Sequence, residues 1–141
     1  MYIARAVMAV GVCMLIVAVN AQASAQSGAP GDEQSQIAGV WRGNSVCTVK
    51  NSPCHDEVNV YHISEIAGRP GWFFVSADKI VNGREVVMGT GDWKYEKEAH
   101  ALIYDFERGT FRLNIGDGKM EGDLKLKDGT VYRLIHLQKE K

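Results

Sequence analysis

The sequence has no apolar run long enough to cross a membrane as a helix. The longest run, Ala6 to Val19, contains about 14 residues, whereas a bilayer core needs roughly 20. It lies between Arg5 and two overlapping small-x-small sites, Ala21-Gln22-Ala23 and Ala23-Ser24-Ala25. This arrangement is typical of a cleaved secretory signal peptide. We therefore expect residues 1–25 to be removed, no membrane span to remain, and the mature protein to be periplasmic or secreted.

Cysteine is scarce, with three residues in a chain of 141. Cys13 lies inside the apolar run, and Val12 stands where a lipoprotein signal carries a small residue, so a lipid anchor is disfavoured. Cleavage removes Cys13 and leaves Cys47 and Cys54, an even pair in an exported chain, which predicts a disulfide between them. The alternative is a metal–thiolate site, but it needs further soft ligands at close spacing, and only His55 is adjacent.

Neither sign of charge dominates, because 16 Lys and Arg stand against 17 Asp and Glu, and the two kinds are interspersed. Nucleic-acid binding requires positive charge that is clustered in a stripe or patch, which the sequence lacks. An anionic membrane surface attracts the same kind of cluster. We therefore expect neither a nucleic acid nor a membrane surface as a partner.

Catalytic motifs are missing as well. The sequence has no Gly-x-Ser-x-Gly nucleophile motif, and Gly116-Asp117-Gly118 is not followed by a helical pattern, so it indicates a turn rather than a phosphate loop. His55, Asp56, Glu57 and His62 could supply metal ligands, but neighbouring residues on a strand point to opposite faces. We therefore expect no enzyme, no cofactor and no metal site.

The chain instead contains a series of short alternating segments separated by turns. We expect strands at about 39–47, 57–66, 72–81, 84–95, 99–106, 110–115, 119–127 and 130–138. Asn82-Gly83 is a strong hairpin signal, and Gly89-Thr90-Gly91 predicts a break or bulge. Connections this short permit only neighbouring antiparallel pairing, and closure removes the exposed edges.

The predicted fold is therefore all-β, an eight-stranded antiparallel up-and-down barrel with no major helix. It forms a single domain over residues 37–141. Residues 26–36 are polar and lack apolar periodicity, so we expect a disordered N-terminal tail there. An eight-stranded barrel is either filled by side chains or holds one small ligand.

Gly39-Val40-Trp41, which opens the first predicted strand, resembles the Gly-x-Trp signature of the lipocalins and the wider calycin superfamily. The resemblance implies that Trp41 plugs the closed end of the barrel and that a basic residue of the last strand packs across it. Arg133 is the matching candidate, since it alternates with apolar neighbours and therefore faces inward. The chain is similar to small exported bacterial proteins of unassigned function.

We predict that the barrel binds a small, partly apolar ligand in its interior. His62 shares a face with Val58 and Val60 and would orient the ligand if that face is interior. The predicted ligand-binding residues are Trp41, His62, Trp72, Tyr104 and Arg133, although core filling is the favoured role for most of the large aromatic residues. The alternative is an inhibitor of an envelope protein, such as a protease or lysozyme, that uses the Cys47–Cys54 loop or the tail at 26–36.

Overall fold

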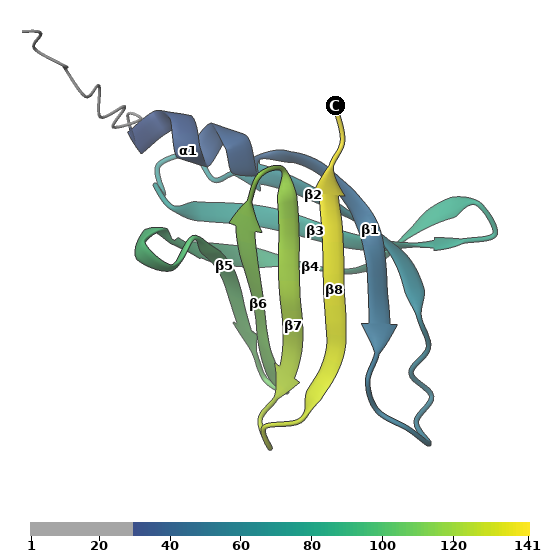
Figure 1. Cartoon of the computed structure of the whole chain (residues 1–141). Coiled ribbons are helices and arrows are strands. Elements are labelled where there is room, and N and C mark those ends of the chain that lie inside the picture. The colour runs from purple at the N-terminus through teal and green to yellow at the C-terminus, as the bar shows by residue number, and fades with distance from the viewer. Residues whose placement is uncertain (1–29) are drawn as a thin grey trace, which may run out of the picture.

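A computed structural model describes residues 30–141, so the predicted signal peptide and residues 26–29 lie outside the described residues. The eight strands form one closed antiparallel sheet in chain order, with the last strand paired to the first (Figure 1). They are β1 (Gly39–Cys47), β2 (Glu57–Glu65), β3 (Trp72–Val81), β4 (Arg84–Glu96), β5 (Ala101–Phe106), β6 (Gly109–Gly116), β7 (Lys119–Leu126) and β8 (Val131–Lys139), with a short 3-10 turn, η1, at Lys97–Ala99. The predicted all-β up-and-down barrel is confirmed.

Two-residue turns hold neighbouring strands together. Asn82 and Gly83 have φ of 50° and 75°, and Asp117 and Gly118 have φ of 51° and 70°. Positive φ at both positions gives a turn whose twist matches that of the flanking strands. The β3–β4 register shifts between Ala77 and Asp78, so the bulge lies at Met88 and not at the predicted 89–91, where the pairing is regular.

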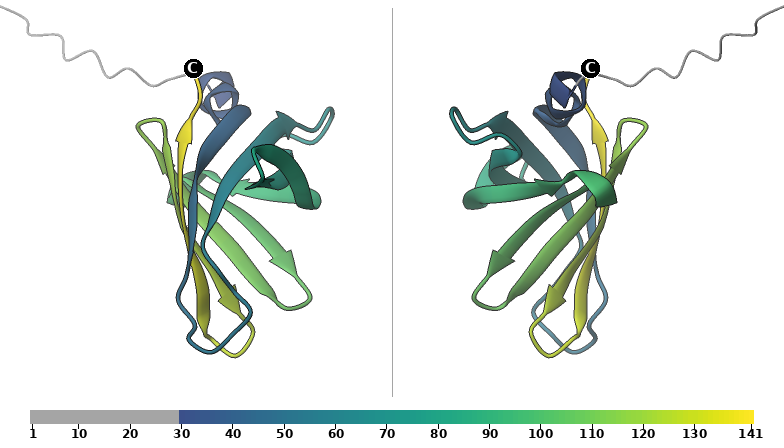
Figure 2. Two further views of the ribbon diagram at one scale, coloured as in Figure 1. Left: turned by 90° about the vertical axis from the view of Figure 1, so that its right-hand side faces the viewer. Right: turned by 90° about the vertical axis from the view of Figure 1, so that its left-hand side faces the viewer.

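The N-terminal segment differs from the prediction. Where we expected a disordered tail to residue 36, Pro30–Ile37 form a helix, α1, that lies across one end of the barrel (Figures 1 and 2). Ile37 is buried in the core, Tyr95 Oη donates a 2.7 Å hydrogen bond to Glu33 Oε1, and Lys139 Nζ donates to the Gln36 carbonyl. The helix is stabilised by the barrel rather than by its own polar sequence, which is why periodicity does not reveal it.

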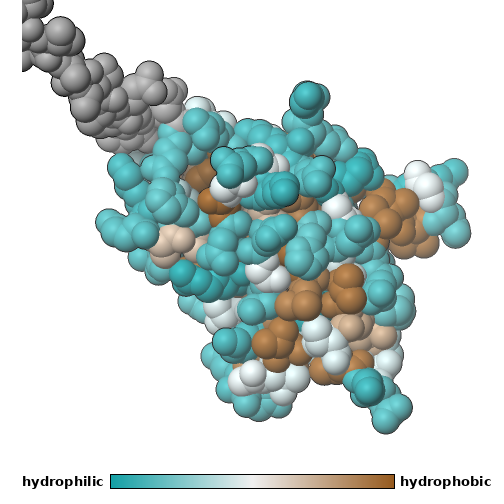
Figure 3. All heavy atoms as spheres, viewed as in Figure 1, coloured by the Kyte–Doolittle hydropathy of each residue, from teal (hydrophilic) through white to brown (hydrophobic). Residues whose placement is uncertain are grey.

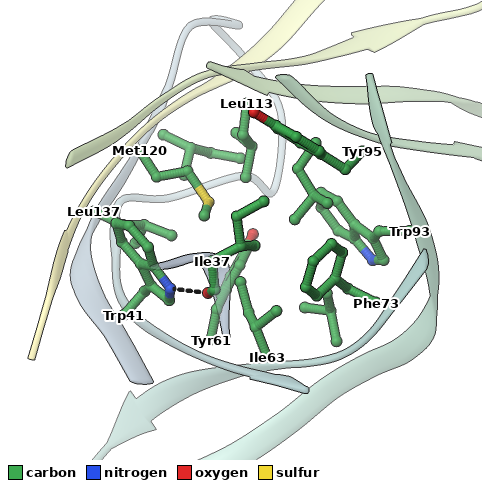
Figure 4. Packing of buried hydrophobic residues seen from close by; sticks show 13 residues of the cluster. Ile37, Trp41, Tyr61, Ile63, Phe73, Trp93, Tyr95, Leu113, Met120 and Leu137 are labelled. Atoms are coloured by element: carbon green, nitrogen blue, oxygen red, sulfur yellow. Dashed lines mark hydrogen bonds between the residues drawn. The ribbon is translucent and has the colours of Figure 1, made fainter. Parts of the chain in front are cut away.

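The half of the barrel beneath α1 is filled by apolar side chains. Ile37 stands at the centre of this packing, and Trp41 Nε1 donates a 2.8 Å hydrogen bond to the Ile37 carbonyl oxygen (Figure 4). Around them the buried cluster includes Phe73, Leu102, Leu113, Met120 and Leu137. Of the helices that the structure describes, none is long and apolar enough to span a bilayer.

Acid is expected to loosen the contact between α1 and the barrel. The hydrogen bond from Tyr95, followed by the hydrogen bond and charge of His100, lowers the pKa of Glu33 below its ordinary value of 4.5. A carboxylate with a lowered folded pKa stabilises the fold fully above its unfolded pKa, and this contribution is lost as the pH falls through the folded value. The NMR shift of the Trp41 indole proton, whose acceptor is on α1, should therefore move on acidification below about pH 4.5.

The Glu33→Gln variant is the control for this titration. Glutamine can still accept the Tyr95 hydrogen bond, but it does not ionise. The indole shift of the variant should therefore stay constant over the same pH window. An equal acid-induced change in the variant would show that another group governs the docking of α1.

The predicted disulfide is present between Cys47 and Cys54, and it closes the loop between β1 and β2. The Cys47 amide donates a 2.8 Å hydrogen bond to Asp56 Oδ1, and the Thr48 hydroxyl donates to the Val131 carbonyl. The loop is thus fixed to its own base and to β8, at the end of the barrel away from α1 (Figure 1).

Replacing both Cys47 and Cys54 by serine should lower the free energy of unfolding by about 2.5 kcal/mol, because the unfolded chain regains the entropy of an eight-residue loop. Urea denaturation of the variant and of the reduced wild-type protein should give the same midpoint. A variant as stable as the oxidised wild type would contradict this estimate.

Candidate ligand-binding cavity

The half of the barrel away from α1 contains a cavity of about 270 Å³. Its floor is shared with the packed half, because Tyr61, Trp93 and Ile135 contribute to both. Met88, Gly89 and Thr90 of β4 also line the cavity and are exposed, so it opens to solvent beside that strand.

One wall of the cavity is aromatic and comes from β4, β5 and β6. The rings of Trp93 and Tyr104 are stacked with centroids 5.3 Å apart, and Phe106 continues the stack 5.9 Å beyond Tyr104. Phe111 packs against the same group, 5.4 Å from Trp93. Gly91 makes this arrangement possible, since a Cβ there would lie 2.7 Å from the Tyr104 ring. The wall offers flat apolar surface on which a ring can stack.

The facing wall is polar and comes from β1, β2, β3 and β8. Arg133 Nη1 donates a 3.0 Å hydrogen bond to Ser45 Oγ and lies 3.4 Å from Glu57 Oε2. Lys79 Nζ lies 3.3 Å from the other oxygen, Glu57 Oε1. Only 15% of the Arg133 side chain and 11% of the Glu57 side chain are exposed. Ions this poorly hydrated must be paired, and Glu57 balances two cations at once.

Asn59 completes the polar wall. It is almost fully buried, and its Nδ2 donates a 3.2 Å hydrogen bond to the Asp78 carbonyl. Its Oδ1 is the single buried side-chain polar atom without a hydrogen-bond partner among the side chains of residues 33–141. Buried acceptors are normally satisfied, so this oxygen is an exception, and it belongs to a residue that lines the cavity.

The seam between β4 and β5 explains why the cavity is open there. These strands pair over only three positions, from Lys94 with Ile103 to Glu96 with Ala101. By contrast, β6 and β7 pair over eight positions. At the other end of β4, the β3–β4 hairpin projects away from the barrel (Figure 1), and Figure 3 shows an apolar patch on it. The exposed apolar residues of the hairpin are Val81, Val86, Val87 and Met88.

The structure brings two of the five predicted ligand-binding residues to the cavity. Tyr104 lies on the aromatic wall and Arg133 on the polar wall. Trp41 is buried in the packed half instead, and Trp72 lies outside the barrel core, where the Arg69 guanidinium stacks 4.5 Å from its ring centroid. The residues that sequence reasoning missed are Ser45, Glu57, Asn59, Trp93, Phe106 and Phe111.

His62 does not face the interior. The inward face of β2 carries Glu57, Asn59 and Tyr61, whereas His62 lies on the outer face. Its Nε2 is 2.8 Å from Glu85 Oε2 and 3.8 Å from Asp78 Oδ2. These three side chains offer ligand atoms within 4.8 Å of one another, and Glu85 also forms an ion pair with Arg42 at 3.3 Å.

The other residues considered as metal ligands are also placed apart. The His55 ring lies 2.9 Å from the Pro53 carbonyl, and Asp56 caps the Cys47 amide. Glu57 points inward to Arg133. His55, Asp56 and Glu57 therefore do not converge with His62, as the alternation along a strand predicts.

The cation that packs across Trp41 is not the predicted one. Trp41 does lie at the closed end, but Lys139 Nζ is the group above its ring, 5.7 Å from the centroid. Arg133 is inward-facing as predicted, yet it belongs to the polar wall of the cavity, six residues earlier along β8. Placing Arg133 over Trp41 was therefore wrong, because the two lie in different halves of the barrel.

Comparisons with known proteins show the fold alone. No protein-family model matches the sequence. No curated protein matches it either. Among solved structures, the chain is similar to a redesigned β-barrel with a TM-score of 0.56 and 16% identity, over 76% of this chain and 94% of that one. The likeness supports the eight-stranded antiparallel architecture.

Proposed function

We propose that this protein is a non-enzymatic, exported barrel that binds one small, partly apolar ligand in its open half. The observation that carries the proposal is the division of the cavity into an aromatic wall and a polar wall. Ligand pockets combine mostly apolar lining with a few placed polar groups in this way. A cavity of about 150 Å³ accommodates benzene. The 270 Å³ here therefore suit a ring that carries a polar substituent.

Export and lipocalin-like architecture form part of the same proposal. The disulfide is compatible with an oxidising compartment such as the periplasm or the extracellular space. Trp41 at the closed end and an open opposite end are the arrangement that the lipocalin resemblance implies. Lys139 takes the position over Trp41 that the resemblance assigns to a basic residue of the last strand.

A substitution that fills the cavity without altering its aromatic or polar wall tests the proposed ligand binding. Gly89 lines the cavity, does not have positive φ, and has no atom within 4 Å of a Cβ built on it. We therefore expect Gly89→Phe to fold normally and to place its ring in the ligand space. Gly116→Phe is the matched control, because Gly116 is equally unobstructed and does not line this cavity.

Native mass spectrometry of the mature protein, purified from its own host, provides the measurement. Wild type and Gly116→Phe should carry a discrete extra mass that denaturation removes, and Gly89→Phe should lack it. An extra mass that persists in Gly89→Phe would place the ligand elsewhere. Wild-type preparations that never carry an extra mass would count against a resident ligand and favour the inhibitor alternative.

The inhibitor alternative would act through the Cys47–Cys54 loop. Lys50, Asn51 and Pro53 of this loop are exposed, whereas residues 33–36 of the predicted tail are docked on the barrel through α1. Changing the exposed loop residues to alanine would then abolish binding to the target protein and leave the retained ligand mass unchanged.

A further inference from the structure

The charged side chains at the cavity are not balanced. Arg108 and Arg133 line it together with a single carboxylate, Glu57, and Lys79 contacts that same carboxylate. Three cations thus stand against one anion around a partly desolvated space. We propose that the cavity selects a ligand that joins an aromatic ring to an anionic group, of which a carboxylate is the simplest. This inference rests on the proposed ligand-binding function and names the class of ligand.

Arg133 has unused capacity to bind an anion. Its Nη1 serves both Ser45 and Glu57, and its Nε and Nη2 have no partner among the residues that the structure describes. A guanidinium presents its donors as a planar fork that matches a carboxylate with two parallel hydrogen bonds. Because this side chain is only 15% exposed, such a bond forms in poorly hydrated surroundings, where charge-assisted hydrogen bonds are stronger.

Arg108 adds a second cation at the rim. It lies in the turn between β5 and β6, two residues after the Phe106 ring that ends the aromatic stack. Among the side chains of residues 33–141 that of Arg108 has no ion-pair partner, although it lines the cavity. A ligand whose ring continues the stack therefore brings its substituent into a field of positive charge.

The polar wall also indicates what the ring itself should carry. Asn59 lines the cavity, and its Oδ1 is a buried acceptor without a partner. A ring N–H or hydroxyl is the kind of group that would satisfy this oxygen once the amide turns toward the ligand. A carbonyl or ether oxygen at the same place would leave it unsatisfied. Indole derivatives meet both requirements, and they are available with an acidic, a neutral or a basic side chain.

The experiment is isothermal titration calorimetry of the full mature protein at neutral pH and low salt. The three probes are indole-3-acetate, indole-3-acetamide and tryptamine. The ring is the same in all three, so the comparison isolates the charge of the substituent. We expect the acid to bind at least about tenfold more tightly than the amide, the scale of one charge-assisted hydrogen bond, and tryptamine to bind most weakly. Equal affinities for acid and amide, or a preference for tryptamine, would overturn the proposed ligand class.

The outcomes separate this inference from the function on which it rests. Acid and amide that bind equally in wild type, and are both lost in Gly89→Phe, would keep the ligand-binding cavity and reject its preference for anions. Absence of binding by any probe, together with absence of a retained mass in the native protein, would reject both.

Two substitutions should change the affinity for the acid in opposite directions. Arg108→Gln should weaken indole-3-acetate binding about fivefold and leave the amide unchanged, because it removes one cation from the rim. Glu57→Gln should strengthen it, because it removes the only lining carboxylate. Structural damage cannot produce this gain, and thermal unfolding checks that both variants are folded. Arg84→Gln, in the exposed β4 segment away from the lining residues, is the control and should bind like wild type.

Discussion

Replacing Trp41 by alanine is expected to lower the free energy of unfolding by about 4 kcal/mol, within the range for a fully buried tryptophan. Trp41 is 1% exposed and packs at the closed end among Ile37, Met120 and Leu137. Alanine would leave a large cavity there and would also remove the 2.8 Å hydrogen bond to the Ile37 carbonyl. Domains of this size are stabilised by roughly 5–15 kcal/mol, so the variant should unfold at a far lower urea concentration.

Two further variants identify the cause of this loss. Trp72→Ala removes the same type of side chain from a half-buried position, where the Arg69 guanidinium lies over the ring, and should cost about 1 kcal/mol. Trp41→Phe keeps most of the packing and loses the indole hydrogen bond, so its cost should lie between the two. If Trp41→Ala were no more destabilising than Trp72→Ala, the closed end would not be the stable part of the barrel.

The strands of this barrel are readable from the sequence because their signals are local. The bounds of β1 and β3 coincide with the predicted 39–47 and 72–81. Asn82-Gly83 adopts the positive φ values that such a pair favours, and parity of the cysteines gives the disulfide. The start of β5 was placed two residues too early, because Lys97–Ala99 form a 3-10 turn and His100 has φ of 46°. This turn comes directly after the end of β4, and no strong local sequence motif predicts it.

The inward face of β2 could not be assigned from alternation. Val58, Val60 and His62 form one face, and Glu57, Asn59 and Tyr61 form the other; both mix apolar and polar residues. The pairing of Trp41 with Tyr61 decides between them, because directly opposite residues share a face. β1 and β2 are joined by the disulfide loop and not by a two-residue turn, so the sequence did not predict how the two strands are aligned. For this reason His62 was placed inside and Asn59 was overlooked.

The polar wall was missed for a related reason. Glu57 of β2 meets Arg133 of β8 over the intervening strand β1, although 76 positions separate them in the chain, and Lys79 reaches Glu57 from β3. In the sequence Glu57 and Lys79 have the appearance of ordinary surface charges, and only Arg133 was predicted to face inward. Only closure of β8 onto β1 places Arg133 beside Ser45 and turns separate charges into one site. A site that is assembled from three or four strands leaves no spacing signal in the sequence.

A single methyl group at Gly122 is expected to destabilise the barrel by about 3 kcal/mol, at the upper end of the cost of overpacking. A Cβ at this position of β7 would lie 1.8 Å from the Arg112 carbonyl oxygen and 2.9 Å from the Leu113 Cα of β6. Both are backbone atoms within a strand that pairs with β7 over eight positions, so they cannot move away without breaking pairs. Glycine in a strand marks such a close backbone approach.

Gly116→Ala is the matched control for Gly122→Ala. Gly116 ends β6, does not have positive φ, and has no atom within 4 Å of a Cβ built on it. Alanine there should leave stability unchanged or raise it by about 0.5 kcal/mol, because the unfolded chain becomes less flexible. Urea denaturation of both variants tests whether the steric conflict, rather than the loss of a glycine, is responsible. Equal stability of the two would show that β6 and β7 can separate at Gly122, and the barrel wall would then be softer than its pairing indicates.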